Sequence, residues 1–258
     1  MLVVRGEQNM LLKRWDKLPD NMKTEAVKPY YDIISKKKFS LFFKRITDIV
    51  LALLMIIVFS LPMLVIALVI VIDSRGGVFY RQERITTYGK VFRIHKFRTM
   101  VADADRIGTQ VTVGQDSRIT KVGSFLRKYR LDEIPQLFDV LSGNMSYVGT
   151  RPEVPKYVYR YSDEMMATLL LPAGITSEAS IRFKDEAELL DGKDDVDKAY
   201  IEKVLPKKMA FNLDSIKSFG YFSDIATMVR TVFAVFGIKD YNEVHTDVGE
   251  ENIYHMHN

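Results

Sequence analysis

Residues 49–72 read IVLALLMIIVFSLPMLVIALVIVI, an apolar run in which only Ser60 and Pro62 are not hydrophobic. Nothing else in the chain approaches this hydrophobicity. A run of about 18 or more apolar residues indicates a segment that enters a membrane. This stretch decides the fold, because the rest of the chain must be arranged around a membrane segment.

Both flanks of the apolar run are basic, with Lys36–Lys38 and Lys44–Arg45 before it and Arg75, Arg81 and Arg84 after it. Positive charge marks the cytoplasmic end of a membrane segment. Basic residues at both ends therefore favour a chain that enters and leaves by the same face, where anionic headgroups would attract them.

The middle of the run predicts how the chain turns back. Pro62 lacks an amide hydrogen and kinks a helix, and the Ser60 hydroxyl can bond a nearby carbonyl. The arm 46–60 is only about 22 Å long at the helical rise, less than the ~30 Å hydrocarbon core. A re-entrant helix-break-helix fits these lengths. A straight spanning helix with a tolerated proline is the alternative that the residues leave open.

Composition narrows the function classes. The chain has 258 residues, 47% of them hydrophobic and 27% charged, which predicts a folded domain. A net charge of only +4 gives no indication of nucleic-acid binding. The absence of cysteine excludes disulfides and thiolate chemistry. Three of the four histidines lie after residue 244, which argues against a histidine metal site in the main domain. The apolar run starts too late and is too long for a secretory signal peptide.

We therefore divide the chain into an N-terminal amphipathic arm (1–43), a re-entrant membrane helix (44–73), a catalytic domain (74–239) and a C-terminal tail (240–258). The arm is expected to lie on the surface or at the membrane interface, or to be a simple N-terminal extension. The expected fold class is α/β, mostly helical with a small β-hairpin, in a monotopic membrane protein. Alternating residues predict a hairpin from 78–82 and 91–100. Helices are expected near 21–35 (interrupted at Pro29), 100–106, 125–129 (capped by Ser124), 132–143 (capped by Gly143), 153–168, 194–213 and 223–236.

Asp132 and Glu133 form the sharpest candidate for chemistry. They lie at a predicted helix start, where free amide hydrogens and the helix dipole favour anions. An ionised carboxylate is a competent nucleophile toward phosphorus, and a second carboxylate can hold Mg²⁺ together with substrate phosphates. Taken alone, the pair is more typical of helix capping than of catalysis.

Cations spread along the sequence could bind a diphosphate, since guanidinium groups match phosphate oxygens. Viewed singly, each is more often a solvated surface cation than a phosphate ligand. A further polar cluster follows the turn at residues 172–176. The candidate substrate- or phosphate-binding residues are Lys96, Arg98, Thr99, Arg127, Arg151, Arg182 and Lys184.

Several stretches, in order and at characteristic spacing, resemble the bacterial sugar transferases, the monotopic phosphoglycosyl transferases that initiate glycan assembly. The resemblance covers residues 44–236. It is carried by KRITDI (44–49), the apolar run with its Ser/Pro break, VFYRQER (78–84), FRIHKFRTM (92–100), LRKYRLDEIPQLFDVLSGNMSYVGTRP (126–152) and PAGIT (172–176).

The resemblance implies transfer of a sugar 1-phosphate from a UDP-sugar to undecaprenyl phosphate with release of UMP. It implies that Asp132 forms a covalent phosphosugar intermediate in a ping-pong mechanism and that Glu133 helps to hold Mg²⁺. It also implies a re-entrant helix with Ser60 and Pro62 at its break, on the cytoplasmic face of the bacterial inner membrane. The products would enter exopolysaccharide, capsule, O-antigen or glycoprotein glycan assembly. Membrane lipid, a homodimer and downstream glycosyltransferases are the compatible partners, and nucleic acid is not.

Three departures from the family pattern matter. Leu61 separates Ser60 from Pro62, where the family has Ser-Pro. The family's GPRP reads GTRP at 149–152, and its GITGWAQV reads GITSEASI at 174–181, which leaves the sugar donor undefined. A late family aspartate aligns loosely with Asn212.

Two other classes remain to be weighed. A catalytically silent membrane scaffold of a glycan assembly complex would not need Asp132 and Glu133 intact. A single-pass protein with a soluble binding domain would place the two flanks of the apolar run on opposite membrane faces.

Overall fold

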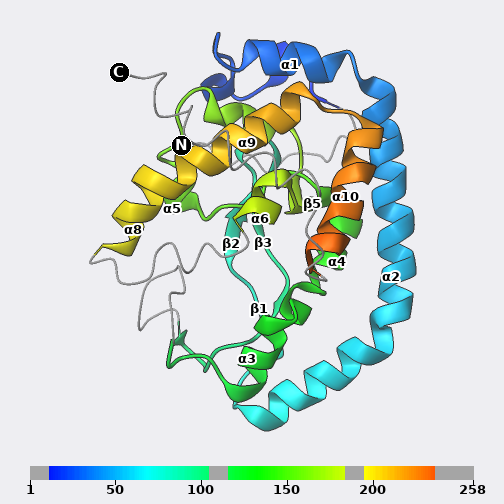
Figure 1. Cartoon of the computed structure of the whole chain (residues 1–258), viewed down its shortest axis with the longest axis vertical. Coiled ribbons are helices and arrows are strands. Elements are labelled where there is room, and N and C mark those ends of the chain that lie inside the picture. The colour runs from blue at the N-terminus through cyan, green and yellow to red at the C-terminus, as the bar shows by residue number, and fades with distance from the viewer. Residues whose placement is uncertain (1–11, 105–115, 184–194, 236–258) are drawn as a thin grey trace.

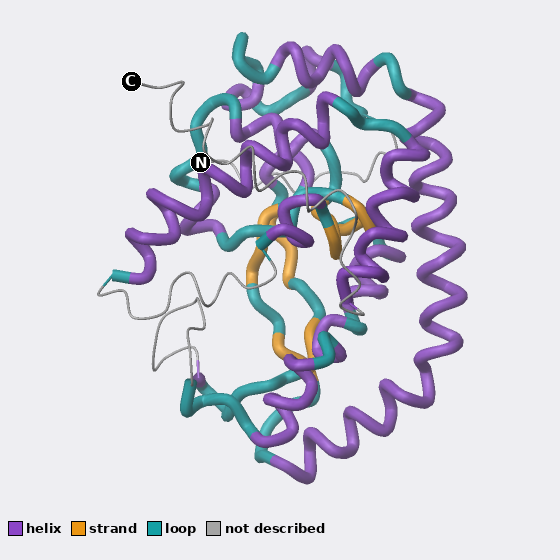
Figure 2. Tube along the Cα trace, viewed as in Figure 1, coloured by secondary structure: helices purple, strands orange, loops and turns teal. Residues whose placement is uncertain are grey.

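The apolar run folds into α2 (Lys38–Asp73), one continuous helix of 36 residues with Pro62 inside it. Figures 1 and 2 show that α2 runs along one side of the molecule and bends in its second half. This computed structural model describes residues 12–104, 116–183 and 195–235. The Ser60 hydroxyl donates a 2.7 Å hydrogen bond to the Ile57 carbonyl. The expected break is therefore a bend in an unbroken helix, with Ser60 bonding a carbonyl as predicted.

Both ends of α2 are fixed to the same folded body. Near its start, Lys44 donates to the carboxylate of Asp224 (2.7 Å), and Arg45 donates to the carbonyl of Val140 (2.7 Å). Near its end, Ile70 is buried in an apolar cluster with Phe97. Between these ends, Ala52 is fully buried against Phe92 and Val140, so the inner side of α2 packs along the domain.

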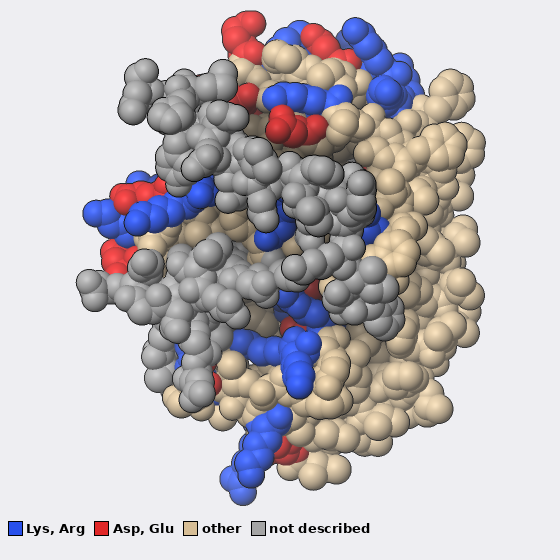
Figure 3. Space-filling model, viewed as in Figure 1, with Lys and Arg blue, Asp and Glu red and all other residues tan. Residues whose placement is uncertain are grey.

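The outward side of α2 is apolar and exposed. Ile57, Leu61 and Ile72 have exposed fractions of 71%, 67% and 84%. The space-filling view shows a continuous edge over α2 without Lys or Arg (Figure 3). Among the described residues, α2 is the one helix long and apolar enough to cross a membrane, with a mean hydropathy of 3.2 in its most apolar window. A side this apolar and this exposed indicates contact with lipid.

The predicted hairpin is confirmed, and it has two ladders. Near the turn, β2 (Glu83–Ile85) pairs antiparallel with β3 (Val91–Arg93). Further along, β1 (Phe79–Tyr80) pairs antiparallel with β4 (Lys96–Phe97). The turn places Tyr88 and Gly89 at φ values of 58° and 77°, the left-handed geometry that tight hairpins require.

A second, parallel strand pair was not predicted. β5 (Met145–Val148) pairs with β6 (Ala173–Thr176), and both contact α10 (Tyr221–Val235). Gly149 and Gly174 pass so closely that a Cβ on Gly174 would lie 2.2 Å from the Gly149 backbone, and a Cβ on Gly149 would lie 2.4 Å from the Pro172 carbonyl oxygen. These glycines permit the close approach.

Several helix boundaries differ from the predictions, among them the division of the helix expected over 153–168 into α5 (Pro155–Val158) and a 3-10 helix, Met165–Leu170. Two of the differences lie close to Asp132 and Glu133. α3 (Lys121–Lys128) is capped by the Thr120 hydroxyl, which accepts from the Gly123 amide, and not by Ser124. The helix expected over 132–143 is split into a 3-10 turn, Leu131–Glu133, and α4 (Gln136–Leu141). Pro135 accounts for the split, since it has no amide hydrogen to donate to the preceding turn. Gly143 ends α4 with a φ of 79°, as predicted.

The N-terminal arm contributes to the core. Met22, Val27 and Ile34 are fully buried against Leu170 and other residues of the domain. The interruption expected at Pro29 is the first turn of α1 (Lys28–Ser35). Of the helix expected over 100–106, residues 100–103 are not helical, Ala104 is in a 3-10 conformation, and residues 105–106 lie outside the described part. The tail from 240 onward also lies outside it. The other helices are α5 (Pro155–Val158), α6 (Glu178–Arg182), α8 (Val196–Ala199), α9 (Leu205–Lys217), 3-10 helices over Trp15–Lys17, Asp20–Met22, Thr87–Gly89 and Met165–Leu170, and a π-helical segment over Tyr200–Val204.

Candidate active site

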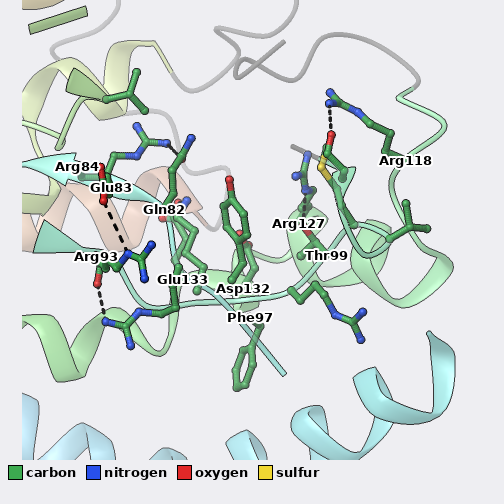
Figure 4. Close-up of a pocket in the computed structure, with 18 of the residues that line it drawn as sticks. Gln82, Glu83, Arg84, Arg93, Phe97, Thr99, Arg118, Arg127, Asp132 and Glu133 are labelled. Carbon is green, nitrogen blue, oxygen red and sulfur yellow. Dashed lines mark hydrogen bonds and ion pairs between the residues drawn. The ribbon is translucent and has the colours of Figure 1, made fainter. Parts of the chain in front are cut away.

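A cavity of about 880 Å³ lies between the hairpin, α3, the 3-10 turn and the segment before α5. Among the described residues, eleven Lys and Arg side chains and only four carboxylates line it. Such an excess of cations concentrates a polyanionic ligand. Asp132 and Glu133 both line this cavity, and Figure 4 shows them beside each other, between Arg84 and Arg127.

The turn that carries the two carboxylates begins at a strained residue. Arg130 follows α3 with a φ of 57°, in the left-handed region that residues other than glycine rarely adopt. This reverses the chain within one residue, so that the next three residues form the 3-10 turn against β4. Backbone strain of this kind concentrates at functional sites.

Glu133 is held by two cations. Its Oε1 accepts from Lys96 Nζ at 2.8 Å and from Arg151 Nη2 at 2.5 Å, and its Oε2 accepts from Arg151 Nη1 at 3.4 Å. Burial alone would raise the pKa of Glu133. Arg151 and Lys96 outweigh that effect and hold the pKa well below its ordinary value. Glu133 is therefore a fixed anion that orients both cations.

Asp132, unlike Glu133, is not held by any cation within bonding distance in the described chain. It is only 9% exposed, and within the described ranges its carboxylate has no hydrogen bond or ion pair. Burial raises the pKa of Asp132, and the charge of Glu133 adds to the rise, although Lys96 and Arg127 oppose it. An anion with few bonds and little water is poorly stabilised, which makes its oxygens reactive.

Arg127 approaches the site from α3. Its Nε donates a 2.8 Å hydrogen bond to the Thr99 hydroxyl, which Figure 4 shows as a dashed line. α3 lies this close because Gly123 has no side chain, since a Cβ there would lie 2.0 Å from the Thr99 carbonyl oxygen. Thr99 thus orients a guanidinium that lines the cavity. Its own hydroxyl already has a partner.

Arg98, expected from the sequence to bind phosphate, has its guanidinium bonded to the backbone that follows α2. Its guanidinium donates to the carbonyls of Arg75 (2.5 Å) and Ser74 (2.8 Å) just after α2. These contacts satisfy carbonyls at the helix end. Arg98 lies at the edge of the cavity, with two of its nitrogens bonded to the end of the membrane helix.

The model of the family described as "Bacterial sugar transferase" matches residues 39–238. The chain belongs to this family. Among curated relatives, a candidate undecaprenyl-phosphate N-acetylgalactosaminyl 1-phosphate transferase of Bacillus subtilis is 41% identical over 47% of this chain and 68% of its own. The UDP-glucose:undecaprenyl-phosphate glucose-1-phosphate transferase of Escherichia coli is 36% identical over 75% of this chain and 40% of its own. The UDP-N-acetylgalactosamine-undecaprenyl-phosphate N-acetylgalactosaminephosphotransferase of Aeromonas hydrophila is 33% identical over 77% and 45%. The match thus spans less than half of the latter two proteins.

In this sugar transferase the structure brings together most of the residues singled out in the sequence. Asp132, Glu133, Lys96, Arg127 and Arg151 converge on the cavity, from segments between 96 and 151. Their individual roles in the reaction remain predictions.

Arg182 lies elsewhere. It pairs with Glu178 on α6 and stacks on Phe211 of α9, and it is not among the residues that line the cavity. Lys184 lies outside the described residues. Asn212 lines a separate, smaller cavity of about 270 Å³ that does not include Asp132 or Glu133.

Sequence reasoning missed Arg84 as a cavity residue. Arg84 lines the cavity wall. Its Nη1 donates a 3.0 Å hydrogen bond to the Pro152 carbonyl, and its Nη2 donates a 2.6 Å hydrogen bond to Gln82 Oε1. Its place in the stretch 78–84, which carries part of the family resemblance, was the available signal. Arg118 also lines the cavity, and its Nη1 donates a 3.0 Å hydrogen bond to the Ala104 carbonyl.

Proposed function

We propose that this sugar transferase moves a sugar 1-phosphate from a UDP-sugar to undecaprenyl phosphate and releases UMP. The observation that carries the proposal is the contrast between two neighbouring carboxylates in one cationic cavity. Glu133 is neutralised by two cations, whereas Asp132 is buried without a partner in the described chain. The names of the related proteins support the same reaction class.

In the proposed mechanism, an Asp132 oxygen attacks the phosphorus that carries the sugar. A bond forms between that oxygen and phosphorus, the bond to the UMP oxygen breaks, and UMP leaves with the electron pair. An oxygen of undecaprenyl phosphate then attacks the same phosphorus and restores the Asp132 carboxylate. Arg127, Arg151 and Lys96 would stabilise the charge that develops on the phosphoryl oxygens. This is a ping-pong route, in which a soluble donor and a lipid acceptor use one site in turn.

Mg²⁺ is part of this proposal. Among the described residues no cluster of three or more His, Asp or Glu side chains is present, so a protein cage is not available. Mg²⁺ does not need one, because it commonly takes one or two carboxylates and completes its shell with phosphates and water. The free oxygens of Asp132, and Glu133 through its weakly bonded Oε2, would hold it. When bound, the ion would offset diphosphate charge.

We also propose that α2 is re-entrant and that the domain lies on the cytoplasmic face of the bacterial inner membrane. A 36-residue helix is about 54 Å long, well beyond the ~30 Å hydrocarbon core. A straight crossing would separate the ends of α2, yet both ends bind one domain, through Lys44 and Ile70. The bend lets the outer apolar side enter one leaflet. This places the cavity near the lipid headgroups.

Topology is testable because the chain has no cysteine of its own. Asp20→Cys and Asp163→Cys, at exposed positions before and after α2, are expected to react equally with a membrane-impermeant maleimide in inverted vesicles. Neither is expected to react in right-side-out spheroplasts. Labelling of the two positions from opposite sides would show that α2 spans the membrane.

The reaction itself is tested with a panel of UDP-sugars, which includes UDP-glucose and UDP-N-acetylgalactosamine. With Mg²⁺ and undecaprenyl phosphate, one of them is expected to give UMP at a rate that depends on the acceptor. Without acceptor, the protein is expected to gain the mass of one sugar phosphate on Asp132. EDTA is expected to stop turnover, and added Mg²⁺ to restore it.

Two results would overturn the proposal. Release of UDP in place of UMP would mean that the sugar moves without its phosphate. If no member of the panel gave either a nucleotide or an adduct, a non-catalytic scaffold in glycan assembly would be the better interpretation.

A further inference from the structure

Arg151 belongs to a segment whose two sides face different environments. Its guanidinium binds Glu133 in the cavity, and Val154, Pro155 and Lys156 continue the same cavity wall. Glu153 lies between them, is 6% exposed, and is not among the residues lining the cavity. Its carbonyl accepts from the Ile85 amide at 2.9 Å. Glu153 therefore fixes the back of this wall.

The Glu153 carboxylate is bound by two residues from the C-terminal half of the chain. Its Oε1 accepts from the Tyr200 hydroxyl at 2.6 Å and from Lys208 Nζ at 3.2 Å. Lys208 Nζ also donates to the Tyr200 oxygen at 2.9 Å, which closes a triangle of hydrogen bonds. All three side chains are nearly inaccessible to solvent. We name this set the Glu153 triangle.

An unusual helix geometry makes the triangle feasible. Tyr200 opens a π-helical segment, Tyr200–Val204, and Lys208 lies in the first turns of α9. In a regular α-helix, residues eight apart point about 80° away from each other. The wider winding of the π-helical segment reduces that angle. π-Helical segments are rare and are common near functional sites.

More contacts brace the same wall. Tyr157 donates a 2.7 Å hydrogen bond to Asp197, and Asp197 also pairs with Lys156. The ring centroids of Tyr157 and Tyr200 lie 4.5 Å apart. Residues 195–208 thus support the wall over its whole length. A buried ion pair adds little net stability over apolar residues, but it fixes geometry.

Glu153 is negatively charged although it is buried, because neighbouring groups stabilise its carboxylate. Burial alone would raise the pKa of Glu153, but Lys208, the Tyr200 hydroxyl and Arg84 outweigh it and hold the pKa below its ordinary value. Arg84 in turn bonds the Pro152 carbonyl, next to Arg151. An anion behind the wall therefore compensates cations that would otherwise repel one another.

We propose that Glu153, Tyr200 and Lys208 are positioning residues that hold the Arg151 guanidinium against Glu133 for phosphoryl transfer. This inference rests on the proposed function for the reaction step, and on geometry alone for the position of the wall. None of the three touches the cavity, so each acts through the segment 151–156.

The first test measures coupling to Arg151. Tyr200→Phe removes one oxygen and is expected to lower kcat about tenfold, with little change in KM for the UDP-sugar, because a misplaced cation weakens mainly the transition state. In the Arg151→Lys background, which has lost the guanidinium, the same change is expected to have little further effect. Tyr159→Phe, at a tyrosine that is 60% exposed, is the matched control and is expected to keep full activity.

Equal losses of kcat from Tyr200→Phe in both backgrounds would overturn the inference, as would full activity of Tyr200→Phe alone. Lys208→Met repeats the test with a buried apolar chain of similar length, and exposed Lys207→Met is its control. If Lys208→Met fails to fold, Tyr200→Phe alone decides, because it keeps the ring packing.

The second test does not depend on turnover. Amide hydrogen exchange of peptides covering 149–158 is expected to be about tenfold faster in Tyr200→Phe than in wild type, with peptides of 121–128 in α3 unchanged. Unchanged exchange at 149–158 would overturn the inference even if the protein proved inactive with every UDP-sugar. Failure of the proposed function would instead appear as a wild-type protein without UMP release.

Discussion

Asp132→Asn is expected to reduce UMP release by at least about a thousandfold, because an amide cannot replace a carboxylate as nucleophile. The side chains have nearly the same shape, so the cavity should be preserved. The mass increase expected without acceptor should disappear as well. Both quantities are measured on the purified membrane protein with the donor identified from the panel.

Stability separates loss of chemistry from loss of fold. Burial raises the pKa of Asp132, so the ionised carboxylate is less favourable in the folded protein than in the unfolded chain. A neutral amide removes that cost, and the Tm of Asp132→Asn is expected to match or exceed that of wild type at neutral pH. Asp163→Asn, at an exposed position, is the control and should change neither quantity. Wild-type turnover in Asp132→Asn would exclude the covalent mechanism.

Local patterns in the sequence predicted the parts of the site that are local in the chain. The alternation over 91–97 predicted the hairpin that brings Lys96 to Glu133, and both carboxylates lie on one short turn. Gly143 predicts a helix end because helices commonly end at a glycine with a left-handed φ, and the structure gives Gly143 a φ of 79°. Such features depend on neighbours within a few residues. They can therefore be inferred before the structure is known.

The missed features depend on contacts between distant segments. The Glu153–Lys208 pair joins residues 55 apart, and either member alone resembles a surface charge. Arg98 was expected at a phosphate, but its partners at Ser74 and Arg75 are known only once α2 has been placed. Thr120 and Ser124 were equally suitable caps by residue type. The choice between them follows from the packing of α3 on the Thr99 segment.

The arm before α2 shows the same limit. Its spacing of apolar residues predicted a helix over 21–35, and α1 confirms the part from Lys28 onward. The expected surface or interfacial position was wrong, because Met22, Val27 and Ile34 are buried against the domain. An apolar stripe specifies that it will be covered, and the partner that covers it is a property of the whole fold.

Glu133→Gln is the second change with a large expected effect. Glu133 holds Lys96 at 2.8 Å and Arg151 at 2.5 Å, and a neutral amide binds both cations more weakly. Two cations that move out of place would stabilise the transition state less. We expect kcat to fall about a hundredfold, while the protein still folds and still forms the adduct on Asp132.

The pH profile distinguishes this role from a merely steric one. Asp132 must be ionised to attack, so activity falls as the pH drops through its pKa. The Glu133 charge is one of the causes that raise this pKa. Its removal is therefore expected to move the acid limb of kcat/KM to lower pH, whereas exposed Glu202→Gln should leave the limb in place. An acid limb that stays put or moves upward in Glu133→Gln would show that the two carboxylates do not influence each other through charge. In that case the contrast between a neutralised Glu133 and an unpartnered Asp132 would no longer support the proposal that Asp132 is the nucleophile.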